Sequence, residues 1–136
     1  METYLWMAGS LPLLILGSIH LFYTLFTNKF STRNPNLEAE MKASSPLLTK
    51  EISMWSAWVG FNASHSSGVM YIGVVNFLVA AFQLPLLYHP IFIVLNLSTV
   101  VFYLWLAKKY WFSTPLKGVI ISLVFFVAAT IVMLVT

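Results

Sequence analysis

The stretch that decides the fold is residues 54–73, which read MWSAWVGFNASHSSGVMYIG. It lies in a long run without acidic residues, lysine or arginine, and yet it is rich in small and polar side chains. Polar groups are costly in hydrocarbon unless another part of the protein pairs with them. We therefore expect this stretch either to hold helices together or to bind a ligand. Its small and polar residues are Gly60, Asn62, Ser64, His65, Ser66, Ser67, Gly68 and Gly73.

The composition of the whole chain is that of an integral membrane protein. Of its 136 residues, 60% are hydrophobic and 8% are charged, whereas a soluble domain carries about 25% charged residues. The chain has no cysteine, which excludes disulfides, thiolate metal sites and covalent c-type haem attachment. The first apolar segment has no basic region before it, so we expect no cleavable signal peptide.

Four apolar segments predict an all-α, four-helix membrane bundle that forms a single transmembrane domain over residues 1–136. Each segment is long enough to cross a hydrocarbon core of about 30 Å as a helix. A polar loop at 28–51 joins the first two segments. The four predicted spans cover approximately residues 5–27, 52–82, 86–107 and 114–136.

The positive charges predict the topology. All seven lysine and arginine residues lie in the first loop, around 108–111 or at the start of the fourth span, and none lies at a terminus or at 83–85. The positive-inside rule then places both termini outside and both basic connections in the cytoplasm. The net charge of +3 is thereby explained by topology, and we expect the lipid bilayer, not nucleic acid, as the partner.

The cytoplasmic loop contains two patterns typical of helix starts. Asn34-Pro35 resembles an N-cap followed by proline, and it predicts a short amphipathic helix at the membrane surface over 35–43. Ser45-Pro46 predicts a second start, with a helix that continues into the second span. We interpret the loop as an ordered connector, with a partner-binding surface as the alternative.

Polar residues of three predicted spans fall at similar depths. His20 lies about 10 Å from the cytoplasmic end of its span, and His65 about 17 Å, at a helical rise of 1.5 Å per residue. Asn96 in the third span has a similar depth, and Asn62 and Ser66 flank His65. We predict that these five residues, His20, Asn62, His65, Ser66 and Asn96, form one ligand-binding layer in the inner half of the bundle.

Glycines accompany this layer. Gly60, Ser64 and Gly68 are four residues apart, a spacing that allows another helix to approach closely. Gly17 and Gly68 both lie on the outer side of their neighbouring histidine in antiparallel spans. At that level either the two helices touch or a gap opens for a ligand, and the sequence does not choose between these.

Three functions fit these residues. The leading prediction is a small non-catalytic membrane protein, either an accessory subunit of a larger complex or a binder of a hydrophobic ligand, alone or as a homo-oligomer. The first alternative is a b-type haem or quinone-linked redox protein in which His20 and His65 bind the cofactor, since two histidines on neighbouring helices suit a porphyrin. The second alternative is a membrane enzyme that acts on a lipid-like substrate through His65.

Three segments of the chain resemble a known group of proteins. They are WSAWVGFNASHSSG at 55–68, HLFYTLFTNKF at 20–30 and SSPLLTKE at 44–51. Together they resemble a family of small bacterial four-span membrane proteins of uncharacterised function. The resemblance implies a four-helix architecture in a bacterial inner membrane, and it implies no activity.

Overall fold

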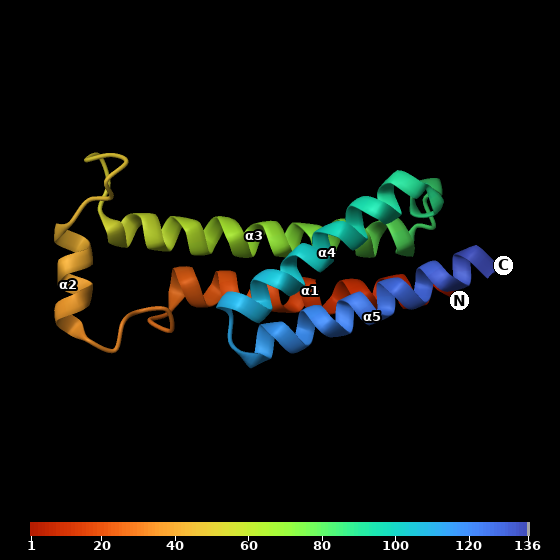
Figure 1. The fold of residues 1–136 in the computed structure, drawn as a ribbon, viewed down its shortest axis with the longest axis horizontal. Helices are drawn as coiled ribbons and strands as arrows, with labels where there is room; N and C mark the ends of the chain where they lie inside the picture. The colour runs from red at the N-terminus through yellow and green to blue at the C-terminus, as the bar shows by residue number, and fades with distance from the viewer. Residues whose placement is uncertain (136) are drawn as a thin grey trace. The chain divides into compact units, whose positions relative to one another are not determined.

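The computed structural model describes residues 1–135, which form five α-helices, one 3-10 helix and no strand (Figure 1). Four of the helices are long and apolar enough to cross a membrane: α1, α3, α4 and α5. The predicted all-α class with four membrane-length helices is therefore confirmed. Thr136, the last residue of the predicted fourth span, lies outside the described residues. The elements are α1 (Glu2–Phe26), α2 (Pro35–Ala43), α3 (Met54–Ala81), η1 (Pro85–Tyr88), α4 (Pro90–Tyr110) and α5 (Ser113–Val135).

The surface of the long helices is apolar, as a lipid-facing surface must be. Large aliphatic and aromatic side chains stand exposed along all four helices. In water such a surface would be a strong aggregation liability, whereas in hydrocarbon it costs nothing. We therefore treat the chain as an integral membrane protein. Exposed examples are Ile15, Phe22, Phe61, Tyr71, Val94, Phe102, Val124 and Ile131.

The short helix in the first loop agrees with its prediction. Helix α2 covers Pro35–Ala43, and the side chain of Asn34 accepts a hydrogen bond from the backbone N–H of Asn36 at 3.0 Å. This contact satisfies one of the amide groups that a helix start leaves without a partner, and proline at the first position lacks such a group.

Two helix starts differ most from their predictions. The third span begins at Pro90 rather than at residue 86, because η1 occupies Pro85–Tyr88 and the imidazole of His89 then caps α4 by accepting from the N–H of Ile91 at 3.3 Å. The second correction concerns Ser45-Pro46, which starts no helix. The loop is closed instead by a hydrogen bond from the N–H of Met54 to the carbonyl of Ser44 at 2.8 Å, and α3 begins there.

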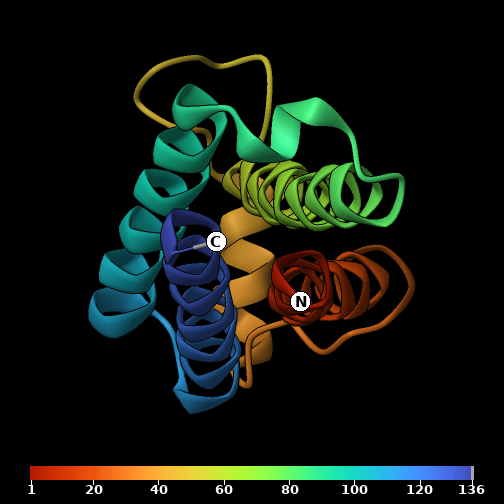
Figure 2. The same ribbon diagram turned by 90° about the vertical axis from the view of Figure 1, so that its right-hand side faces the viewer.

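The chain divides into two compact units, and α1 and α3 contribute to both. The first unit consists of Met1–Leu16 together with Val69 and the rest of the described chain. Within it, α4 and α5 are antiparallel and pack side by side (Figures 1 and 2). The core of this unit is centred on Trp6, whose ring lies 4.8 Å from that of Phe126 and 6.0 Å from that of Phe92.

The second unit is Gly17–Gly68. It contains the end of α1, the polar loop with α2, and the first half of α3. Helix α2 runs crosswise to α3 in this unit (Figure 1). Of the five predicted site residues, all except Asn96 belong to it.

Candidate functional site

A hydrogen bond between α1 and α3 lies at the centre of the second unit. His20 Nε2 and Asn62 Oδ1 are 3.1 Å apart. The other end of the Asn62 carboxamide is fixed, because Nδ2 donates to the carbonyl of Trp58 at 2.9 Å. Since a carboxamide oxygen only accepts, the hydrogen of this bond must be on His20 Nε2. In the neutral imidazole the lone pair is therefore on Nδ1.

The ring of His20 lies between two other rings. Phe30 stacks on it with centroids 4.4 Å apart and planes inclined by 23°. His65 meets it edge to face, with centroids 5.7 Å apart and planes at 72°. The two histidines that the sequence predicts to share a layer thus lie in contact.

The geometry leaves the haem alternative a prediction. An axial ligand must offer a nitrogen lone pair to iron. Nε2 of His20 is bonded to Asn62, so Nδ1 is the nitrogen of this ring that could act as such a ligand. A porphyrin between the two imidazoles would require them to separate from their edge contact.

Hydroxyl groups near the layer bond to their own helices. Ser66 is buried, and its hydroxyl lies within hydrogen-bond distance of the carbonyls of Asn62, at 2.7 Å, and Ala63, at 3.1 Å. Thr24 likewise donates to the carbonyl of His20 at 2.8 Å. These bonds are local and leave the imidazoles and the Asn62 amide as the polar groups that join the two helices.

A narrow crevice borders this layer. Trp58 donates through its indole N–H to the carbonyl of Phe30 at 3.1 Å, which fixes the chain that leaves α1 against the start of α3. Phe30 both lines the crevice and stacks on His20, so its ring lies between the crevice, whose free volume is about 20 Å³, and the histidine layer. Its wall is mostly aromatic and hydroxylic, from Thr24, Thr27, Phe30, Ser31, Trp55, Trp58 and Val59.

A larger, open cavity, whose surface is mostly apolar with a few polar groups, adjoins the crevice. It has a volume of about 480 Å³ and lies between the chain that follows α1 and the helix α2. Ser31 lines both spaces, so the two are neighbours. The cavity is lined by Asn28, Ser31, Thr32, Pro35, Glu38, Ala39 and Lys42.

The close approach that the spacing of Gly60, Ser64 and Gly68 allows is not found, and of the two alternatives at Gly68 the structure has the gap. A Cβ atom added at Gly60 or Gly68 would meet no described atom within 4 Å, so no helix of this chain packs closely there. The close approach occurs at Gly73 instead, where a Cβ atom would lie 2.5 Å from the backbone nitrogen of Leu14. Beside His65, the Gly68 position is therefore open.

The structure joins His20 to both Asn62 and His65, and Ser66 bonds the backbone of Asn62. Asn96 belongs to the first unit, and its place in the same layer stays a prediction. It is 6% exposed, and neither atom of its amide has a hydrogen-bond partner among the described residues.

Sequence reasoning missed two contributors. Phe30 lies in the loop, and nothing in its spacing indicates that it folds back onto His20. Trp58 precedes Asn62 by four residues, so the helical period does place its carbonyl next to the Asn62 amide.

No protein-family model, curated protein or solved structure matches the chain.

Proposed function

We propose that this chain is a small non-catalytic integral membrane protein that binds an amphipathic hydrophobic ligand in its second unit. The observation that carries this proposal is the position of Phe30, which stacks on His20 and also lines the aromatic crevice. Displacement of the Phe30 ring would widen the crevice, whose free volume is about 20 Å³, and would open it to the polar groups of the layer. The result would be a mostly apolar site with a few converging polar groups, as is typical of small-molecule pockets.

Binding accounts for the polar layer better than catalysis does. The predicted spans contain no aspartate or glutamate that could orient an imidazole as a general base. Asn62 instead holds the Nε2–H of His20, which leaves Nδ1 to accept a hydrogen bond from a ligand hydroxyl or amine. Such a group recognises a ligand without requiring any proton transfer.

The location of the protein is part of the proposal. The distribution of lysine and arginine favours termini outside and the loop with α2 in the cytoplasm. The resemblance to small bacterial four-span proteins favours a bacterial inner membrane. On this topology the aromatic crevice lies near the cytoplasmic interface, where tryptophan side chains are enriched.

The test is to identify what co-purifies with the full chain. The protein is extracted in mild detergent, and bound molecules are measured by mass spectrometry and by an absorption spectrum. We expect a lipid or quinone that the wild type and Ser64→Ala retain and that His65→Ala and His65→Gln lose. Ser64 is the matched control, because it is exposed and its hydroxyl bonds only the carbonyl of Phe61 on its own helix.

Each other outcome contradicts the proposal in its own way. A layer that only holds helices together predicts that the His65 variants lose thermal stability and that no ligand is found in any of the proteins. A Soret band would establish the haem alternative. Extraction as part of a larger complex, without a small ligand, would establish an accessory subunit.

A further inference from the structure

The open cavity next to the crevice has the size of a ligand site. Its volume of about 480 Å³ lies within the range of about 300–1,000 Å³ that is usual for small-molecule pockets. None of the five residues of the histidine layer lines it. Its chemistry is therefore separate from that of the layer, although both belong to the second unit.

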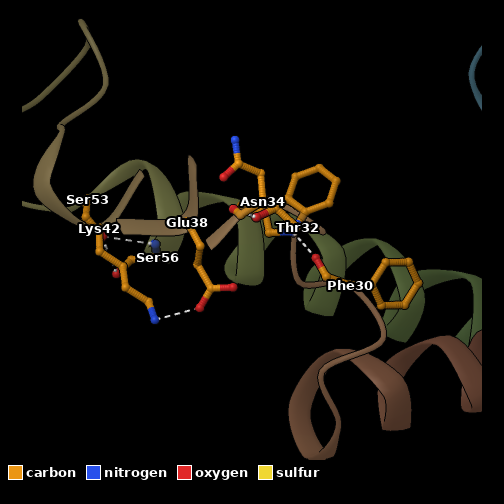
Figure 3. Close-up of polar contacts among 8 residues, drawn as sticks. Phe30, Thr32, Asn34, Glu38, Lys42, Ser53 and Ser56 are labelled. Atoms are coloured by element: carbon orange, nitrogen blue, oxygen red, sulfur yellow. Dashed lines mark hydrogen bonds and ion pairs between the residues drawn. The ribbon is translucent and has the colours of Figure 1, made fainter. Parts of the chain in front are cut away.

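The cavity wall carries one charge of each sign. Lys42 Nζ lies 2.7 Å from Glu38 Oε1, and Figure 3 shows the two side chains turned toward each other. The ammonium of Lys42 also lies 5.2 Å from the centre of the Trp55 ring, which lines the aromatic crevice. Both charged side chains stay accessible, since the Lys42 side chain is 54% exposed and that of Glu38 is 24% exposed.

Further polar groups of the wall are available to a ligand. Asn28 and Ser31 line the cavity, and their side chains make no hydrogen bond to any described residue. Thr32 donates its hydrogen to the carbonyl of Asn34 at 2.6 Å, which leaves its hydroxyl oxygen as an acceptor (Figure 3). The wall thus offers an ammonium, a carboxylate and two uncommitted polar side chains.

This set of groups favours a ligand that is itself zwitterionic. A phosphate can accept from Lys42 and Ser31, and a primary ammonium can donate to Glu38. A headgroup with only a negative charge would satisfy Lys42 and would be repelled by Glu38 at the same time. A ligand with both charges gives each protein charge an opposite partner.

The neighbouring crevice indicates that such a ligand has an apolar part. Ser31 belongs to both walls, and the crevice beyond it is lined by Phe30, Trp55 and Trp58. Tryptophan rings at the end of a membrane-length helix are typical of the headgroup level of a bilayer. The crevice itself, with a free volume of about 20 Å³, is too small for an acyl chain, so the apolar tail of such a molecule lies against exposed side chains beside it, such as Met54 and Trp58.

We propose that the cavity between the chain that follows α1 and the helix α2 binds the headgroup of a zwitterionic glycerophospholipid with a primary ammonium, with its acyl chains against exposed apolar side chains at the start of α3, such as Met54 and Trp58. The phosphate contacts Lys42 and Ser31, and the ammonium contacts Glu38. This inference rests on the proposed function and names the class of its ligand.

The experiment measures headgroup preference by native mass spectrometry of the full chain in detergent. The probes are phosphatidylethanolamine, phosphatidylglycerol and diacylglycerol with identical acyl chains. We expect the wild type to prefer phosphatidylethanolamine to phosphatidylglycerol by about tenfold, the effect of one charge-assisted hydrogen bond. The preference should fall to about one in Glu38→Gln. In Lys42→Gln, both phospholipids should bind about tenfold more weakly relative to diacylglycerol, while phosphatidylethanolamine stays preferred.

The two substitutions break the same ion pair and yet should act differently on the preference. Loss of the ion pair as a mere structural contact would move both variants in the same direction, and that result would overturn the inference. Glu40→Gln and Lys50→Gln make the same charge changes at residues that do not line the cavity, and they should leave the preference unchanged. An equal effect of Glu40→Gln would show that net charge, not the cavity, sets the preference.

The two proposals fail in different ways. If the wild type binds diacylglycerol as well as either phospholipid, the headgroup inference is wrong and the hydrophobic-ligand function stands. If the wild type binds none of the three lipids and carries no other ligand, both are wrong.

Discussion

The indole N–H of Trp6 donates to Oδ1 of Asn76 at 2.9 Å, and both side chains are buried. The bond joins α1 to α3 across 70 residues of sequence. The Asn76 amide is oriented by a second bond, from Nδ2 to the carbonyl of Ile72 at 3.0 Å. Between helices in a membrane such bonds average about 0.6 kcal/mol, with a maximum of about 1.7 kcal/mol.

We expect Asn76→Leu to destabilise the protein by about 1–2 kcal/mol, because it leaves the buried Trp6 N–H without a partner. Trp6→Phe and the double variant complete a mutant cycle, measured by thermal unfolding in detergent. The coupling between the two residues should be about 0.6–1.7 kcal/mol. A coupling of zero would mean that the bond contributes nothing to stability.

Gly73 should tolerate no side chain. A Cβ atom there would lie 2.5 Å from the backbone nitrogen and 2.8 Å from the Cα of Leu14, so α1 and α3 must separate to admit it. We expect Gly73→Ala to lower the melting temperature clearly. Gly60→Ala is the matched control in the same helix, because a Cβ atom there meets no described atom within 4 Å. The control should be neutral or stabilising, since alanine favours helices over glycine by about 1 kcal/mol. Equal effects of the two substitutions would contradict the close approach at Gly73.

Removal of the buried amide of Asn96 should stabilise the protein, whereas removal of the amide of Asn76 should destabilise it. Neither of its polar atoms has a hydrogen-bond partner among the described residues. Burial of an unpaired amide costs about 1–3 kcal/mol. Asn96→Leu, which keeps a similar volume, should therefore raise stability by about 1–2 kcal/mol in a thermal unfolding assay.

A ligand assay on the Asn96→Leu variant then tests the predicted role of this residue. If Asn96 contacts the ligand, the more stable variant should retain less of the co-purifying molecule than the wild type. A fall in stability, in contrast, would show that the amide is hydrogen-bonded in the membrane.

The topology can be tested by cysteine labelling without background, because the natural sequence has no cysteine. Ser45→Cys places a thiol in the first loop, and Leu84→Cys places one in the turn before η1, at positions that are both exposed. A membrane-impermeant maleimide should label Leu84→Cys in intact cells and Ser45→Cys only after lysis. The reverse pattern would contradict the predicted orientation.

Much of the fold could be predicted from local sequence. Four apolar segments of sufficient length predict the long helices, and Asn34-Pro35 predicts the start of α2 at its observed residue. The errors arose where two local signals compete. Pro85 and Pro90 both permit a helix start, and the cap provided by His89 selects the later one.

The candidate site could be predicted only in part. Spacing and depth indicate that His20, Asn62 and His65 lie near one another, because a regular helix converts residue number into position. The hydrogen-bond direction at His20 follows from the bond between Asn62 and the carbonyl of Trp58. The helical period allows that bond, and only the structure shows that it forms and that His20 faces the other end of the amide.

The sequence by itself determined that this is an all-helical membrane chain, because uninterrupted apolar segments of about 20 residues have the length of a spanning helix, in which every backbone group is paired within the segment. It also determined which polar residues are available at the level of the histidines. Only the tertiary structure decided that Phe30 covers His20 and that α1 and α3 approach closely at Gly73 and not at Gly60. The first contact depends on how the loop after α1 folds back, and the second on how α1 and α3 are rotated about their axes. A helix that is apolar on nearly all sides has no hydrophobic pattern that specifies its rotation.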